Sequence, residues 1–425
     1  MSYELEYLEL LGFEVTTDAR AVSSRFPTTF EEYVEPTWPA FLLDLIPSGH
    51  ARRFWERELG LPNTEGPQKR PPQRSRSDPS AKREGRVWGG GVGGEAPDVE
   101  NDWSVLVRGA GNPPGNVRVA SAAEVAPLGE HPGFERGEIL ERRDAFIEYA
   151  RSRGASVAGG SGAAGDAPKF LLREDDRGRW HADGALDDAR TRASWLVKFP
   201  RSAASDDRLV LEAEAPYARV ASRFGVRVAA GLTWERDCLF VPRFDRRREA
   251  DGSLGRLGLE SLYSLAGVAA FGAPTSKDVF ARALARCATD PRAELRELLL
   301  RDVLDVALGN TDNHGRNTSV LKEPRGPTRL SPLYDFAPMI LDVQGIARVS
   351  RWDAEREGYP EWGAVADSLA VHGLEPAPTK AWLRALAPRV AALPDMMRDE
   401  GVPARVIHVL TERVARVARS LEATR

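Results

Sequence analysis

A nine-residue segment constrains the fold and the chemistry of this chain more than any other part of it. The segment, Gly309-Asn-Thr-Asp-Asn-His-Gly-Arg-Asn, places Asp312 and Asn317 five residues apart. It follows an apolar stretch, residues 293–308, whose spacing predicts a helix, so we expect both side chains on a loop that leaves that helix. Asp and Asn are also ordinary turn residues, so the segment alone does not indicate a site.

The residues after this loop extend the pattern. Hairpin patterns at 319–321 and 329–333 lead to Asp335. Phosphoryl transfer needs a carboxylate near the acceptor hydroxyl, oxygen ligands for Mg²⁺ and a cation on the nonreacting phosphates. The order of helix, loop, hairpin and aspartate is that of kinases. It predicts Asp312 as the catalytic base and Asn317 and Asp335 as magnesium ligands. The alternative is that Asp335 only caps the next helix.

A lysine in an apolar strand pattern supplies the expected cation. Lys198 lies within Trp195-Leu-Val-Lys-Phe, where an unpaired ammonium would be costly. Its predicted partner is Glu214 on the helical stretch 207–224, as in the lysine and glutamate pair of kinases. Glu212 is a second candidate partner, and a lysine that reaches solvent from a strand end is the structural alternative.

A glycine-rich run lies upstream of this lysine, between Ser156 and Lys169. Glycines let backbone N–H groups approach phosphate oxygens closely, so we expect the run to contact ATP. The residues assigned to that contact are Gly159, Gly160, Ser161 and Gly162. Such a run is also typical of a flexible turn.

The segment Val241-Pro-Arg-Phe-Asp-Arg joins the β-rich part of the chain to the helical part. A kinase hinge contacts adenine at this place, so Phe244 and Asp245 are expected beside the nucleotide. Asp245 could bond the ribose hydroxyls. The ordinary alternative is an ion pair between Asp245 and Arg246 or Arg247.

Residue patterning predicts an α+β, two-lobed protein-kinase-like fold. Five strand patterns lie between 169 and 244, with one helix packed on the sheet they form. Helical spacing dominates after 245. The expected divisions are an N-terminal subdomain at 1–150, an N-lobe at 151–244 and a C-lobe at 245–425. Within them, β-like runs are expected at 103–108 and 117–120, and C-lobe helices at 259–270, 277–287, 293–308, 379–393 and 403–421.

Composition limits the classes of protein to which the chain can belong. Its 59 basic and 63 acidic residues give a net charge of −4, without the global basic character of nucleic-acid-binding proteins. Cys238 and Cys287 lack a CxxC motif, which argues against a disulfide framework and a zinc site. The sequence has no signal-like start and no run of 18 apolar residues, so we expect a cytoplasmic protein without a membrane partner. Residues 61–100, rich in Pro, Gly, Ser and Arg, are expected to form a flexible insertion.

These motifs together resemble the HipA family, the serine/threonine kinase toxins of bacterial type II toxin-antitoxin systems. The resemblance rests on Thr311-Asp-Asn-His-Gly-Arg-Asn, Leu333-Tyr-Asp, Val241-Pro-Arg-Phe-Asp-Arg and the glycine-rich run ahead of Pro168-Lys169. Weaker similarity covers Phe41-Leu-Leu-Asp-Leu-Ile-Pro-Ser-Gly and Gly115-Asn-Val-Arg-Val. It implies a two-lobed kinase that carries an additional N-terminal HipA-type subdomain.

The resemblance also implies roles and partners. Asp312 would be the catalytic base, Asn317 and Asp335 would bind Mg²⁺, Lys198 would bind ATP phosphate, and His314 and Asp245 would lie beside the nucleotide. A serine of the glycine-rich segment would be autophosphorylated; Ser156 matches best, and Ser161 is the second candidate. The implied substrate is a translation protein such as an aminoacyl-tRNA synthetase. The implied partner is a helix-turn-helix antitoxin, through which DNA would be reached indirectly.

Two other functions stay open at this stage. The pattern Asp-x-His-x-x-Asn at 312–317 also resembles the loop of aminoglycoside and choline phosphotransferases, which act on small molecules. Their second metal motif continues with an aromatic residue and an acid after the aspartate, unlike Tyr334-Asp-Phe-Ala-Pro. The non-enzymatic alternative is a pseudokinase that serves as a scaffold or corepressor.

Overall fold

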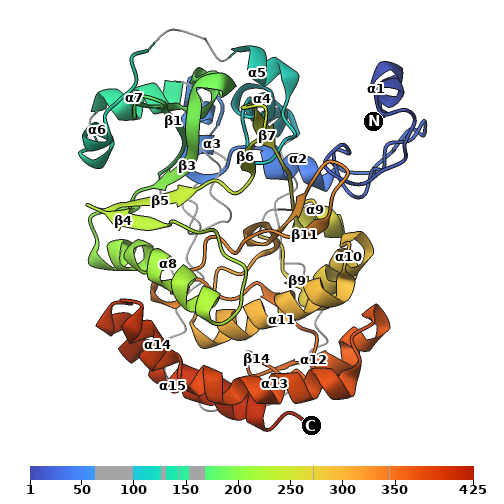
Figure 1. The fold of residues 1–425 in the computed structure, drawn as a ribbon, viewed down its shortest axis with the longest axis vertical. Helices are drawn as coiled ribbons and strands as arrows, with labels where there is room; N and C mark the ends of the chain where they lie inside the picture. The colour runs from blue at the N-terminus through green and yellow to red at the C-terminus, as the bar shows by residue number, and fades with distance from the viewer. Residues whose placement is uncertain (63–98, 126–130, 143, 153–167, 271, 344) are drawn as a thin grey trace.

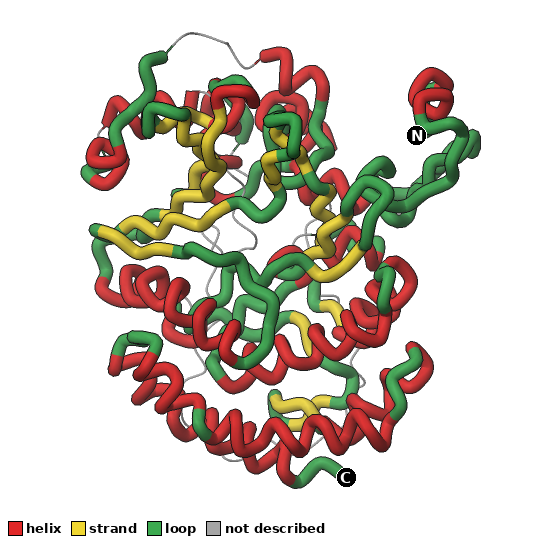
Figure 2. Tube along the Cα trace, viewed as in Figure 1, coloured by secondary structure: helices red, strands yellow, loops and turns green. Residues whose placement is uncertain are grey.

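The computed structural model describes residues 1–62, 99–125, 131–142, 144–152, 168–270, 272–343 and 345–425. The N-terminal helices and the main β-sheet form the upper part of the molecule in Figure 1. Helices α8 (Ser205–Arg223) and α11 (Pro291–Ala307) cross the middle, and α13 (Pro376–Ala391) and α15 (Ala404–Glu422) close the lower end. Most strands lie in the upper half and most long helices in the lower half (Figure 2). This is the expected α+β, kinase-like division.

A five-stranded antiparallel sheet contains the strands expected between 169 and 244. Its order is β2 (Trp180–Ala182), β1 (Lys169–Asp175), β3 (Thr191–Lys198), β5 (Cys238–Pro242) and β4 (Thr233–Glu235). Side chains alternate along β5, as the pleat requires. Leu239 and Val241 pack against α8, whereas Cys238 and Phe240 pack in the cluster that includes Phe146 of α7 (Asp144–Ser152). The central strand β5 is therefore covered on both faces.

The helical part follows the expected periodicity with one exception. Helices α10 (Lys277–Cys287), α11, α13 and α15 match the predicted stretches. The stretch 259–270 instead begins as strand β8 (Gly258–Ser261), and only Leu262–Ala266 is helical, as α9. The reason is a tertiary contact, because β8 pairs with β10 (Ser319–Lys322) of the hairpin that β10 forms with β11 (Thr328–Leu330). The free edge of β10 thus overrides a local helical pattern.

The β-like run expected at 103–108 is wrong, because those residues belong to helix α4 (Val99–Gly109). Val105, Leu106 and Ala110 are all buried in one cluster. A strand would direct neighbours such as Val105 and Leu106 to opposite faces, whereas helical spacing keeps this set on one side. Trp103 points away and is 54% exposed. The run expected at 117–120 is not a strand either; it leads into α5 (Ala120–Val125).

A buried carboxylate fastens the first residues of the chain to the helical part. Glu260 of β8 accepts hydrogen bonds from the Ser23 and Ser264 hydroxyls, from the Ser24 N–H at 2.8 Å and from Lys322 Nζ at 3.0 Å. Burial alone would raise the pKa of Glu260, but Lys322 and these donors hold it below its ordinary value. A buried charge with this many partners is well compensated. It therefore fixes where the N-terminal segment attaches.

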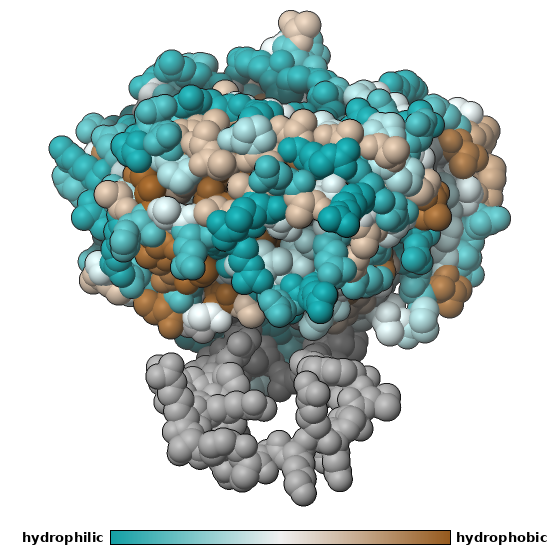
Figure 3. Space-filling model, turned by 90° about the horizontal axis from the view of Figure 1, so that it is seen from below, coloured by the Kyte–Doolittle hydropathy of each residue, from teal (hydrophilic) through white to brown (hydrophobic). Residues whose placement is uncertain are grey.

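Within the described part of the chain, no helix is both long enough and apolar enough to cross a membrane. Seen from the end that carries the C-terminal helices, the described surface is mostly hydrophilic, with apolar side chains in separate groups (Figure 3).

Candidate active site

Lys198 is the centre of a buried charge cluster between the sheet and the helical part. It ends β3, and its Nζ lies 2.6 Å from Oε1 of Glu214 on α8 and 2.5 Å from Oδ1 of Asp335. The side chains of Lys198 and Glu214 are 4% and 5% exposed, whereas that of Asp335 is 22% exposed. The structure thus brings together three predicted residues from three separate segments. Of the two glutamates considered, Glu214 is the one paired with Lys198.

Lys169, which sequence reasoning did not assign to the site, belongs to the same cluster. It lies directly opposite Lys198 in the β1–β3 register, and its Nζ is 3.3 Å from Oδ2 of Asp335. Each carboxylate oxygen of Asp335 therefore faces one ammonium group. The usable signal in the sequence is that Lys169 begins the apolar strand pattern Lys169-Phe-Leu-Leu, where a buried ammonium needs a partner.

The charges in this cluster stabilise one another. Burial would raise the pKa of Asp335, but Lys169 and Lys198 outweigh it and hold the pKa below its ordinary value. Burial would lower the pKa of Lys198, but Asp335 and Glu214 raise it above its ordinary value. The pKa of Glu214 is raised by burial and by the negative charge of Asp335, against the effect of Lys198. The cluster therefore presents an ionised Asp335 beside Lys169 and Lys198.

The predicted catalytic loop leaves α11 as a compact unit held by its own hydrogen bonds. Asn317 Nδ2 donates to the backbone oxygen of Asp312 at 2.8 Å. The backbone N–H of Arg316 donates to Nδ1 of His314 at 3.1 Å, and Nε2 of His314 lies 3.4 Å from Oδ1 of Asp312. Asp312, His314 and Asn317 are all buried. These contacts hold the three expected functional residues close together within one loop.

Close packing explains the glycine inside this loop. The ring of Tyr263 stacks on His314 at a centroid distance of 6.2 Å. A Cβ on Gly315 would collide with the rings of Tyr263 and Phe280. Glycine is therefore needed at this position so that the loop can lie against α9 and α10.

Three tethers connect the loop to its surroundings. The Tyr334 hydroxyl donates to the backbone oxygen of Arg316 at 2.7 Å, which joins the segment of Asp335 to the loop. Asn313 Nδ2 donates to the backbone oxygen of Ser350 at 2.8 Å, and Asn310 Nδ2 donates to Oδ1 of Asp305 at 2.8 Å. Asp335 itself has φ +54°, a left-handed conformation that Asp tolerates better than most residues. The backbone is thus held where the carboxylate meets both lysines.

The two hinge residues expected beside the nucleotide, Phe244 and Asp245, both contact other protein groups. The ring of Phe244 lies 5.9 Å from that of Tyr334. Asp245 is 4% exposed, and Arg243 Nη2 at 2.6 Å and Arg246 Nη1 at 2.8 Å both donate to its Oδ2. The ion pair with Arg246, considered as the alternative to ribose binding, is therefore present, and Arg243 joins it. Arg247 pairs instead with Glu249 and Glu323.

The predicted phosphate-binding residues Gly159, Gly160, Ser161 and Gly162 lie outside the described residues. The same holds for Ser156 and for most of the insertion expected at 61–100.

The oxygen donors of Asn317 and Asp335 fit a magnesium site. Mg²⁺ is usually held by one or two protein carboxylates together with substrate phosphates, and kinases use an aspartate and an asparagine. Asp335 is ionised and partly open to solvent. The amide nitrogen of Asn317 is committed to Asp312, so only its oxygen could serve as a ligand. Among the described residues, no group of three His, Cys, Asp or Glu side chains is placed to hold a metal.

Comparison with known proteins identifies what this chain is similar to. The family model described as the HipA-like C-terminal domain matches residues 161–393. A Sinorhizobium fredii protein named "Putative kinase Y4mE" is 36% identical over 134 residues, which cover 29% of this chain and 31% of that protein. The chain is thus matched to less than a third of that relative's length.

Two of the solved structures that this chain matches differ in how closely they follow its fold. The Shewanella oneidensis HipA, from a complex of HipA, HipB and operator DNA, has a TM-score of 0.58 and 17% identity, over 91% of this chain and 84% of that one. The Helicobacter pylori proinflammatory kinase CtkA has a TM-score of 0.37 and 12% identity, over 63% of this chain and 94% of that one.

Proposed function

The chain belongs to the HipA-like kinase family, and on this premise we propose that it is a magnesium-dependent serine/threonine protein kinase that uses ATP. The observation that carries the proposal is the cluster in which Lys198 meets Glu214 and Asp335. A lysine and glutamate pair beside a metal-binding aspartate is the arrangement by which kinases hold ATP phosphates. A cap role for Asp335 alone, or a Lys198 that reaches solvent from a strand end, does not account for a buried lysine between two carboxylates.

We assign each residue a task in the reaction. Lys198 and Lys169 neutralise nonreacting phosphate oxygens. Asp335 and Asn317 would hold Mg²⁺, which would supply positive charge to offset that of the phosphates. Asp312 orients the acceptor hydroxyl and accepts its proton as that oxygen bonds to the γ-phosphorus and the bond to ADP breaks. Phosphorylated product, ADP and one proton account for the atoms.

His314 acts on Asp312 in this proposal. Its Nε2 lies 3.4 Å from Oδ1 of Asp312, and its Nδ1 is engaged by the backbone of Arg316. The ring therefore restricts the orientation of the carboxylate. Orientation of a base relative to its proton is a large part of what a rigid site contributes to rate.

The finer assignments of substrate, regulation and partner follow the family. We propose a cytoplasmic toxin that phosphorylates a translation protein such as an aminoacyl-tRNA synthetase, and that is regulated by autophosphorylation at Ser156 or Ser161. A helix-turn-helix antitoxin would be its partner, since the Shewanella oneidensis HipA was solved with HipB and operator DNA. The proposed divisions are an N-terminal subdomain at 1–150, an N-lobe at 151–244 and a C-lobe at 245–425.

Intact mass and peptide mapping after incubation with ATP and Mg²⁺ test the proposal. We expect a gain of one or more phosphates in the wild-type protein, at Ser156 or Ser161, and none in Asp312→Asn. Incubation with a cell lysate and labelled ATP should also give phosphoprotein in trans. Efficient transfer to an aminoglycoside or another metabolite without any phosphoprotein would favour a small-molecule kinase. Absence of ATP binding in the folded protein would favour the pseudokinase.

A further inference from the structure

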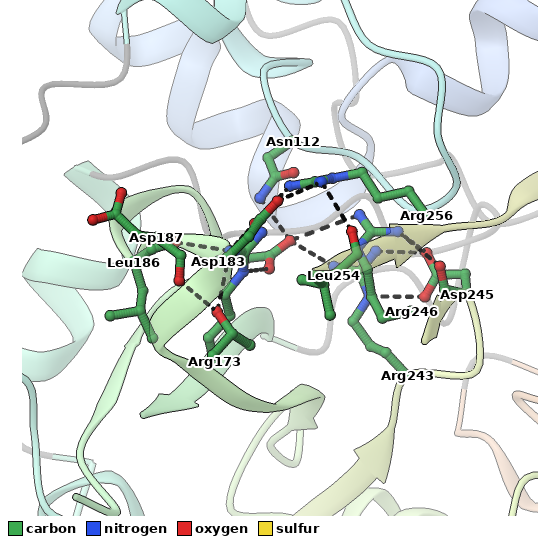
Figure 4. A network of polar contacts seen from close by, with 12 residues as sticks. Asn112, Arg173, Asp183, Leu186, Asp187, Arg243, Asp245, Arg246, Leu254 and Arg256 are labelled. Carbon is green, nitrogen blue, oxygen red and sulfur yellow. Dashed lines mark hydrogen bonds and ion pairs between the residues drawn. The ribbon is translucent and has the colours of Figure 1, made fainter. Parts of the chain in front are cut away.

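Asp183 is one of two buried aspartates that organise a network of arginines around the hinge (Figure 4). It lies in the short 3-10 helix Asp183–Ala185 and is 1% exposed. Arg173 Nε of β1 donates to its Oδ1 at 2.5 Å, and Arg243 Nη1 of the hinge donates to its Oδ2 at 2.6 Å. Asn112 Nδ2, from the loop between α4 and α5, also donates to Oδ2 at 2.6 Å. One carboxylate thus connects three parts of the chain.

Asp245 makes the second set of connections to the same loop. Its Oδ2 accepts from the backbone N–H of Gly115 at 2.7 Å, in addition to the two arginines. Arg246 Nη1 in turn donates to the backbone oxygen of Gly115 at 2.8 Å. Gly115 has φ +84°, and a Cβ there would lie 3.1 Å from the backbone nitrogen of Leu259. Both the conformation and the close approach require glycine.

We propose that Asp245 is a positioning residue that fastens the loop 112–116 to the hinge, so that the N-terminal subdomain sets the arrangement of the two lobes around the nucleotide. The network itself is independent of the proposed kinase function, but its consequence for nucleotide binding rests on that function. Lys198 and Lys169 belong to the sheet, whereas Asp312 and Asn317 belong to the helical part. The hinge, together with the contacts of Asp245 that fasten the loop 112–116 to it, therefore controls how the two halves of the site face each other.

Charge and burial distinguish this role from ribose binding. Burial would raise the pKa of Asp245, but Arg243 and Arg246 hold it well below its ordinary value, so the carboxylate is ionised. Hydrogen bonds between charged groups are roughly twice as strong as neutral ones. Oδ1 of Asp245 accepts from Arg243 Nε at 2.9 Å, and the residue is 4% exposed. A ribose hydroxyl could therefore reach the carboxylate only if the groups packed over it moved away, at a cost to the buried arginines.

Two ligands and four variants separate the two roles. The ligands are Mg·ATP and Mg·2′,3′-dideoxy-ATP, which lacks the ribose hydroxyls, measured by calorimetry. The variants are Asp245→Asn, Asp183→Asn, Asn112→Ala and the control Glu294→Gln. Glu294 is a matched control because it is 4% exposed and pairs with an arginine, Arg227, away from the hinge. Asn112→Ala removes one amide and is the variant of choice if the aspartate variants do not fold.

We expect Asp245→Asn and Asp183→Asn to lower the affinity for both nucleotides by the same factor, about tenfold. Asn112→Ala should lower the two affinities by a smaller factor that is the same for both nucleotides. Glu294→Gln should bind both nucleotides with wild-type affinity. The ratio of the two affinities then stays at its wild-type value. If Asp245→Asn instead abolishes the preference for ATP over dideoxy-ATP, while Asp183→Asn and Asn112→Ala bind like wild type, Asp245 is a ribose ligand and the proposal is wrong.

Hydrogen exchange of the protein without added nucleotide tests whether Asp245 fastens the loop 112–116 to the hinge. This test does not depend on the proposed kinase function. A peptide covering 112–118 should exchange faster in Asp245→Asn than in wild type, because the Gly115 N–H loses its charged acceptor. Glu294→Gln should leave it unchanged. If this peptide exchanged at the wild-type rate in Asp245→Asn, the proposed attachment of the loop would be wrong even if the protein binds ATP. If the wild-type protein binds no ATP, the proposed function is wrong. The attachment of the loop to the hinge is then judged from the exchange result alone.

Discussion

The Nζ atom of Lys198 lies 2.5 Å from Oδ1 of Asp335, so the proposed phosphate-binding cation is paired with the proposed metal ligand. This pairing compensates both charges. ATP and Mg²⁺ together would bring four negative and two positive charges, and Lys198 and Asp335 would each gain a new partner. The two residues are therefore coupled in their effect on nucleotide binding.

Asp312→Asn should abolish phosphoryl transfer and leave Mg·ATP affinity within a few fold of wild type. The reason is that Asp312 acts on the acceptor hydroxyl and has no assigned phosphate or metal contact. Calorimetry gives the affinity and intact mass gives the transfer. A folded Asp312→Asn protein that retains near wild-type transfer would contradict the central assignment.

Asp335→Asn should weaken Mg·ATP binding as well as transfer, by about 1 to 3 kcal/mol for the loss of one charge-assisted ligand. ATP without Mg²⁺ should behave differently, because the variant frees two ammonium groups from their carboxylate. We expect metal-free ATP to bind Asp335→Asn at least as well as wild type. A parallel loss of affinity with and without Mg²⁺ would remove Asp335 from the metal site.

Lys198→Met should destabilise the folded protein by about 3 to 5 kcal/mol, because it leaves the buried Glu214 without its partner. The double variant Lys198→Met/Glu214→Gln should recover much of that stability but none of the transfer activity. Urea denaturation compares the three proteins. Lys169→Met is the control, since Lys169 contacts Asp335, which is partly open to solvent; we expect a smaller loss of stability. Equal destabilisation by both lysine substitutions would refute the special role of the Lys198–Glu214 pair.

Neither cysteine should react with a thiol reagent at pH 8 while the protein is folded. Burial raises the pKa of Cys238 to about 11 and that of Cys287 to about 12. The neutral thiol is therefore the dominant form until the pH approaches those values, and the thiolate is the reactive species. Two equivalents should react in guanidinium chloride and none in its absence. Fast reaction of one equivalent in the native protein would show that one of these thiols is accessible as a thiolate.

The sequence by itself determined the local elements and the order of the chemical groups. Alternating and helical periodicities are local properties, so the five strands of the sheet and helices such as α10 and α11 could be predicted from them. The predicted order of Lys198, Asp312, Asn317 and Asp335 also follows from the chain. Helix α4 was missed because its apolar residues are too few to distinguish helical spacing from the alternation of a strand. Its conformation depends on the burial of Val105 and Leu106 in the cluster that includes Leu43 and Ile46.

Beyond the predicted pair of Lys198 and Glu214, only the tertiary structure decided which distant groups meet. The β1–β3 register places Lys169 opposite Lys198, and no local pattern encodes a register between strands separated by 15 or more residues. The bond from the backbone N–H of Gly115 to Asp245 likewise joins residues 130 positions apart, and it depends on how the loop at Gly115 packs against the hinge. Sequence patterns report which residues can be buried or charged, whereas a buried charge selects its partner from whatever the fold brings within hydrogen-bonding distance.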